Sequence, residues 1–178
     1  MTRDQAYNLM CEMLKSKNLQ KHGLAVEAIM RALCRYLKGK HPELSSEEFT
    51  EEEWARVGVL HDADYELVEK DPTRHTLVTA EKLKPLGVSD RIIKGIKAHH
   101  DGIKESRENL MESSVYAADE LSGLITAVTL VRPDKKLSSV TVESVMKKFP
   151  QKSFAAGANR EQILACEKEL NIPLKEFI

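Results

Sequence analysis

The chain has 178 residues, enough for one domain with a single substantial core, and its 42% hydrophobic and 31% charged residues are typical of an ordinary globular protein. Its net charge of −1 excludes a whole-protein electrostatic field for nucleic acid or an anionic membrane, so we expect neither as a partner. No apolar run approaches the ~20 residues that span a bilayer, and the first residues lack the apolar core of a signal peptide, so we expect a cytoplasmic protein.

The first two predicted helices carry one candidate ligand. Thr2 and Gln5 form a capping-box pattern, and the apolar residues after them recur at helical spacing as far as Leu14. A second helix is predicted from about residue 19 to residue 37, because its apolar residues follow the same spacing before a glycine and a proline. His22 comes three and four residues before two apolar positions of this helix, so it should project from the buried face.

The next two predicted helices carry three further candidates. A threonine and three glutamates at residues 50–53 predict a helix start, and the apolar face of this helix leads to His61 and Asp62 at its C-terminal end. Residues 71–84 are predicted as the following helix, with an aspartate as N-cap and a proline at the first helical position. This assignment places His75 in the first turn of that helix.

Two more predicted helices complete the set of candidates. Ser89 predicts the start of a helix whose isoleucines lead to His99 and His100, before an Asp-Gly exit turn. A longer helix is predicted at about residues 113–131. Asp119 falls near the broad apolar face of this helix rather than on its polar side.

The rest of the chain is also predicted to be helical. The patterns indicate a helix at about residues 141–149 and a last helix that begins after Asn159. No stretch shows the alternation of a β-strand. We therefore predict an all-α fold, a single-domain helical bundle over residues 1–178, with its core at about 1–132 and a C-terminal helical extension at 133–178.

Four of these side chains have the chemistry of one metal site. Nitrogen and carboxylate oxygen ligands from several helices are how a bundle forms a metal site in its core. Two imidazoles and two carboxylates suit a divalent Mn, Fe, Co, Ni or Zn ion. The three cysteines form no C-x-x-C pair, which argues against a structural zinc site. The four candidate ligands are His22, His61, Asp62 and Asp119.

The remaining histidines allow a second metal ion. Neighbouring helical residues diverge by about 100°, so His99 and His100 should not both serve one ion in the same way. One of them could join His75 at a second metal that is bridged by Asp62, while the other meets the substrate. Two metals about 3.5–4 Å apart can stabilise the charge that develops on a phosphoryl group. The expected cofactor is one or two divalent transition metal ions.

This order of histidines and aspartates resembles the signature of the HD-domain metal-dependent phosphohydrolases. The first histidine, the adjacent His61-Asp62 pair and the later aspartate are similar to the metal-binding motif of that family, and the resemblance covers most of the chain. The added histidines resemble its histidine-rich, HDIG-like branch with two metals. The resemblance implies an α-helical bundle, a first metal on the four ligands above, a second metal on His75 and His99 with His100 nearby, and hydrolysis of a phosphate ester or anhydride.

The sequence departs from the common HDIG form after the His-Asp pair. That form has a glycine and often a lysine there, whereas this chain has Ala63, Asp64, Tyr65 and Glu66. The departure puts carboxylates in place of a lysine that contacts phosphate. The implied substrate is therefore open between a cyclic dinucleotide and a smaller phosphoester.

We expect from these features a phosphohydrolase that uses metal-activated water on a nucleotide or a related small phosphoester. The predicted catalytic residues are Asp62, His100 and Asp64, the last two as groups that move protons. Three basic residues in the later part of the chain are predicted either to contact substrate phosphate or to form a solvated face: Arg132, Lys148 and Lys152.

An alternative prediction comes from a different class of protein. The chain could be a non-catalytic helical module that binds a nucleotide or a partner protein and uses the metal for structure alone. Bound transition metal together with turnover would favour the enzyme, whereas nucleotide binding without turnover would favour the module. Nothing in the sequence specifies an oligomeric state.

Overall fold

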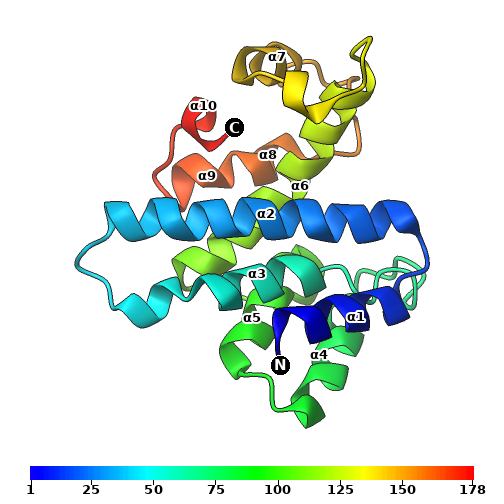
Figure 1. The fold of residues 1–178 in the computed structure, drawn as a ribbon, viewed down its shortest axis with the longest axis vertical. Coiled ribbons are helices and arrows are strands. Elements are labelled where there is room, and N and C mark those ends of the chain that lie inside the picture. Colours follow the sequence, from blue (N-terminus) through cyan, green and yellow to red (C-terminus); the bar gives the residue numbers. More distant parts are fainter.

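Helix α2 (Lys17–Lys40) is the longest element, and it crosses the middle of the molecule (Figure 1). The computed structural model describes residues 1–178, and all of its regular elements are helices. This confirms the predicted all-α fold. None of the helices is both long and apolar enough to cross a bilayer.

The other helices form two groups on either side of α2, and α6 crosses behind it (Figure 1). Helices α1, α3, α4 and α5 lie on one side of α2, and α7 to α10 lie on the other. Their bounds are α1 (Arg3–Met13), α3 (Glu51–Leu60), α4 (Leu77–Leu83), α5 (Asp90–Ala98), α6 (Leu110–Leu130), α7 (Val142–Lys148), α8 (Arg160–Ile163), α9 (Ala165–Lys168) and α10 (Leu174–Phe177). Short 3₁₀ turns join them: η1 (Ser46–Phe49), η2 (Lys84–Leu86), η3 (Asp101–Ile103) and η4 (Leu137–Ser139).

Local sequence signals determine several helix ends. The capping box predicted for Thr2 and Gln5 is present at the start of α1. Asn159 caps α8 as predicted, because its side chain accepts two backbone N–H groups, although the last helix is divided into α8 and α9. The helix start predicted at residues 50–53 is confirmed, since α3 begins at Glu51, although the Thr50 hydroxyl donates to the Glu47 carbonyl and makes no cap bond.

The helix predicted at residues 71–84 starts six residues later, at Leu77. Residues 61–76 instead form a chain of turns that follows the end of α3. Within it, the Asp71 side chain accepts hydrogen bonds from the amide and hydroxyl of Thr73, which is a turn rather than a helix cap. Thr76 then has a left-handed backbone, with φ of 72°, and the helix can begin only after it.

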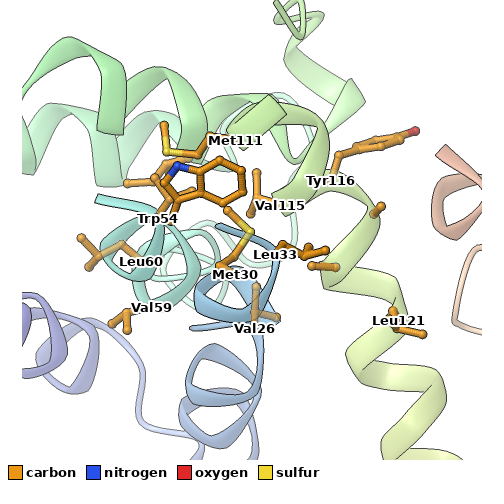
Figure 2. Close-up of a cluster of buried hydrophobic side chains, with 14 of the residues drawn as sticks. Val26, Met30, Leu33, Trp54, Val59, Leu60, Met111, Val115, Tyr116 and Leu121 are labelled. Atoms are coloured by element: carbon orange, nitrogen blue, oxygen red, sulfur yellow. The ribbon is translucent and has the colours of Figure 1, made fainter. Parts of the chain in front are cut away.

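The hydrophobic core joins α2, α3 and α6. Trp54 of α3 is fully buried, and its indole N–H donates to the Glu48 carbonyl at 2.9 Å. Met30 of α2 and Met111 and Val115 of α6 lie around this ring (Figure 2). The aromatic anchor therefore fixes the three helices that carry or precede the candidate ligands.

A close contact between two helix backbones occurs at Gly58 of α3. A Cβ atom at this position would lie 2.7 Å from the Cα and 2.8 Å from the nitrogen of Glu27 in α2. Only glycine lets the two backbones approach this closely. The contact holds the end of α3, with His61, against the part of α2 that carries His22.

We expect Gly58→Ala to lower the free energy of unfolding by about 1–3 kcal/mol, because the added methyl group meets backbone atoms that cannot move aside. The matched control is Gly123→Ala in α6, where a Cβ has nothing within 4 Å. This variant should gain about 0.5–1 kcal/mol from helix propensity. Urea unfolding followed by circular dichroism measures both, and equal stabilities would contradict the assigned contact.

Candidate metal centre

Six of the predicted ligands converge where α2 and α6 meet the ends of α3 and α5. They form two sets of nitrogen and oxygen donors, and the donor atoms within each set all lie within 4.8 Å of one another. One member belongs to both sets. The first set is His22, His61, Asp62 and Asp119, and the second is Asp62, His75 and His99.

His22 of α2 lies at the centre of the first set. Its Nε2 is 3.0 Å from Asp119 Oδ1, 3.1 Å from His61 Nε2 and 3.5 Å from Asp62 Oδ2. The Nε2 of His61 lies 3.6 Å from the same oxygen of Asp119. On its other side, His22 Nδ1 hydrogen-bonds with the Ser122 hydroxyl at 2.8 Å. Helix α6 therefore contributes both Asp119 and the group that orients His22.

The second set uses the other oxygen of Asp62. Asp62 Oδ1 is 3.1 Å from His75 Nε2 and 3.4 Å from His99 Nε2. The two imidazole nitrogens are 3.1 Å apart. Asp62 thus presents Oδ2 to one set and Oδ1 to the other, which is the position of a carboxylate that can bridge two cations.

The ring orientations of His61 and His99 are fixed by backbone carbonyls. His61 Nδ1 donates to the Gly58 carbonyl at 2.8 Å, and His99 Nδ1 donates to the Ile96 carbonyl at 2.6 Å. Because a carbonyl can only accept, the Nδ1 of each ring carries the proton. In a neutral imidazole the Nε2 atom then has its lone pair available to a metal.

Asp64 orients the third imidazole. Its fully buried carboxylate accepts hydrogen bonds from His75 Nδ1 at 2.8 Å and from the amides of Thr76 at 3.0 Å and Thr79 at 2.8 Å. This carboxylate was predicted from the sequence to move protons during catalysis. The structure places it behind His75, where it positions the ring and caps the start of α4 instead of contacting a substrate.

Protons on two imidazoles balance the buried carboxylates. Burial lowers the pKa of His22, but its hydrogen bonds with Asp119 and Asp62 outweigh this effect and raise the pKa to about 10. The pKa of His75 rises to about 9, because its two aspartate partners likewise outweigh burial. Burial lowers the pKa of His99, so this ring is neutral near pH 7. Burial would raise the pKa of Asp62 and of Asp119, but the imidazoles hold both below the usual value.

The donor arrangement fits divalent metal ions. The Nε2 atom of His99 lies 3.4 Å from Asp62 Oδ1, and the Nε2 atom of His61 lies 3.7 Å from Asp62 Oδ2. A divalent cation held between such nitrogen and carboxylate oxygen atoms would replace the imidazole protons that otherwise compensate the buried charge. Imidazole nitrogen and carboxylate oxygen without thiolate suit Mn, Fe, Co, Ni or Zn. Both sets could therefore hold such an ion.

A cavity of about 470 Å³ opens onto the donor atoms. Several residues that line it were not predicted from the sequence. Tyr65, Lys70 and Pro72 come from the turn segment, which we define as residues 61–76. Leu19, Glu120 and Gln162 come from α2, α6 and α8. The cavity thus combines one lysine, one carboxylate and one amide beside the donor sets.

His100 lines the cavity but belongs to neither donor set. Its Nε2 donates to the Pro72 carbonyl at 3.0 Å, which leaves Nδ1 for other contacts. A Cβ at residue 102 would lie 2.1 Å from His100 Nε2, so Gly102 is required for this ring position. The sequence left His100 open as a ligand of the second metal or as a catalytic group, and the structure places it in the cavity lining, outside both donor sets.

The three basic residues predicted to contact phosphate do not line the cavity. Arg132 follows α6 and donates to the Ser139 hydroxyl at 2.8 Å. Lys148 lies at the end of α7 with its ammonium over the Phe154 ring. Lys152 is exposed and likewise lies outside the cavity lining, so the cavity contains none of the three.

Lys70 is the lysine that lines the cavity, and the sequence did not predict it there. It sits in the turn segment with a left-handed backbone, φ of 65°, and its N–H donates to the Tyr65 carbonyl at 3.2 Å. The Asp-Pro pair after it was interpreted as a helix start, and for this reason the turn at Lys70 was not predicted. Gln162 was missed because its spacing from Asn159 indicated only a capping role.

Comparison with known proteins identifies one relationship. A model of the HD domain matches residues 19–124, which is more than half of the chain. The matched range contains all six members of the donor sets and ends before α7 to α10. No curated protein and no solved structure matches the chain.

We expect metal content to follow the two donor sets. The wild-type protein should bind about two divalent ions per chain, as in two-metal phosphotransfer sites. Asp119→Ala and His99→Ala each remove a ligand of one set and should each lose about one ion. Asp62→Ala removes a ligand of both sets and should lose both.

Elemental analysis of protein loaded with Mn²⁺ and then desalted measures these stoichiometries. Circular dichroism confirms that each variant is folded, and Lys82→Met on the exposed face of α4 serves as a control with wild-type content. Asp62→Ala protein that retained its full complement of metal would contradict the bridging position of Asp62.

Proposed function

The chain belongs to the HD domain family of metal-dependent phosphohydrolases, and we propose that it hydrolyses a phosphate ester or anhydride of a nucleotide or related small molecule. The shared position of Asp62 supports this most directly, because its two oxygens face separate donor sets. When bound there, divalent metals supply Lewis acids that activate water and withdraw charge from a phosphoryl oxygen.

The chain's own residues supply orientation around this centre. Asp64 holds His75 in one tautomer, and the Gly58 and Ile96 carbonyls do the same for His61 and His99. Preorganised donors need no rearrangement during the reaction, which is the main way that polar sites lower a barrier. These contacts therefore support hydrolysis as well as metal binding.

Two residues at the cavity surface complete the proposed mechanism. Lys70 offers an ammonium group, which can pair with a phosphoryl oxygen as a point charge. His100 has Nδ1 free, because its Nε2 is held by the Pro72 carbonyl, and we propose that in the imidazolium form this atom gives its proton to the leaving oxygen. The turn segment thus brings phosphate recognition next to the donor sets.

Turnover by metal-loaded protein tests this function. Protein loaded with Mn²⁺, Fe²⁺, Co²⁺, Ni²⁺ or Zn²⁺ should release phosphate from members of a panel of nucleotides and sugar phosphates. Chelation should reduce the rate by at least ~10³-fold, since a metal contributes several kcal/mol of transition-state stabilisation. Metal readdition should restore it. Nucleotide binding without any turnover would instead support a binding module with a structural metal.

Lys70→Met should raise KM for a phosphomonoester and lower kcat/KM about tenfold to a hundredfold, because a charge-assisted hydrogen bond to phosphate is lost. Lys82→Met removes an equally exposed lysine outside the cavity and should leave both constants unchanged. Steady-state kinetics of the three proteins measure the effect. Equal kinetics for the Lys70 variant and the wild type would exclude this residue from phosphate recognition.

A further inference from the structure

Gln162 of α8 brings a hydrogen-bond acceptor to the cavity. Its amide nitrogen donates to the carbonyls of Tyr116 at 2.9 Å and of His99 at 3.4 Å. Carbonyls only accept, so these contacts fix which end of the amide is nitrogen. The Oε1 atom accepts no hydrogen bond from the protein, and it is therefore the polar atom that Gln162 offers to a ligand in the cavity.

Glu120 provides a second acceptor beside it. This residue follows the ligand Asp119 on α6, and its Oε2 accepts the backbone N–H of Asn159 at 2.9 Å. Its Oε1 has no partner within the protein. The Asn159 side chain also caps α8, so one residue ties Glu120 to the helix that carries Gln162. Both acceptors therefore belong to the cavity lining, one on α6 and one on the helix that is bonded to α6 through Asn159.

The wall formed by these residues is unsuited to phosphate. A phosphoryl group carries negative charge and acceptor oxygens, and it would be repelled by the Glu120 carboxylate. Hydroxyl and amino groups, in contrast, donate hydrogen bonds that both free oxygens can accept. Lys70, which pairs with anions, comes from a different part of the chain, the turn segment. The cavity lining thus includes one lysine that can pair with an anion and two free oxygens that can accept hydrogen bonds.

We propose that Glu120 and Gln162 recognise hydrogen-bond donors on the alcohol portion of the substrate, an inference that rests on the proposed function. The preferred substrates are then phosphomonoesters of hydroxylated alcohols, such as nucleosides or sugars. Each additional phosphate would add charge beside Glu120 with only Lys70 as a lining lysine, so di- and triphosphates are poorer substrates.

A comparison of two kinds of substrate across matched variants tests this. Adenosine 5′-monophosphate and glucose 6-phosphate carry hydroxyl donors on the alcohol, whereas phenyl phosphate carries none. Because the ratio of kcat/KM is compared between proteins, intrinsic differences in leaving group cancel. Gln162→Met and Glu120→Met should each lower the ratio of either hydroxylated ester to phenyl phosphate about tenfold, mostly through KM.

The control Gln151→Met replaces an exposed glutamine outside the cavity and should keep the wild-type ratio. Circular dichroism and metal content are measured for every variant, and Met at residue 162 keeps the unbranched shape of glutamine. If one variant does not fold, the ratio for the other decides. A purely structural role would lower turnover of all esters equally, and an unchanged ratio in a folded variant would overturn the inference. Absence of turnover of every ester by the metal-loaded wild type would instead refute the proposed function.

Discussion

The buried negative charge of Asp62 and Asp119 is the constraint on which the arrangement of this protein depends. A carboxylate taken out of water costs several kcal/mol unless positive charge and hydrogen bonds surround it. The surrounding imidazoles meet this requirement with protons on His22 and His75, as the raised pKa values of these two rings show. A divalent cation meets the same requirement, since it binds the Nε2 lone pairs that the protons otherwise occupy.

Helix packing places those charges within reach of one another. The backbone contact at Gly58 brings α3 against α2, and the same residue's carbonyl holds His61. At the other end of the site, Gly102 leaves room for His100 against the Pro72 carbonyl. Glycine therefore acts at two points where a side chain would displace an imidazole. At Gly58 the same residue therefore sets the helix contact and the position of an imidazole in the donor set.

The sequence was sufficient for much of the fold and the donor sets, because their signals are local or chemically distinctive. The capping box at Thr2 and the helix that carries Asp119 follow from spacing alone. The structure brings Asp119 to the His61-Asp62 pair, as the predicted site required. Nitrogen and oxygen ligands on the buried faces of helices have few alternative explanations, which is why their convergence could be anticipated.

The turn segment and the part of the cavity lining that contains Glu120 and Gln162 could not be predicted, because their contacts are distant in sequence. Asp64 hydrogen-bonds with the amides of Thr76 and Thr79, twelve and fifteen residues away, and these bonds set the start of α4. A local pattern cannot reveal such a cap. Arg132 belongs to a group of basic residues that are close in sequence but lie outside the cavity, whereas Lys70 is brought to the cavity by a left-handed turn.

The match to the HD domain includes both donor sets but not helices α7 to α10. Residues 19–124 contain the donor sets, the turn segment and Glu120, so family membership accounts for the metal chemistry. Gln162 lies beyond that range, on a helix held to α6 through Asn159 and to the end of α5 through the His99 carbonyl. The C-terminal extension is thus bonded directly to the backbone of a candidate ligand. Under the proposed function, a helix in that position would alter which alcohol fits the cavity without any change to the two donor sets.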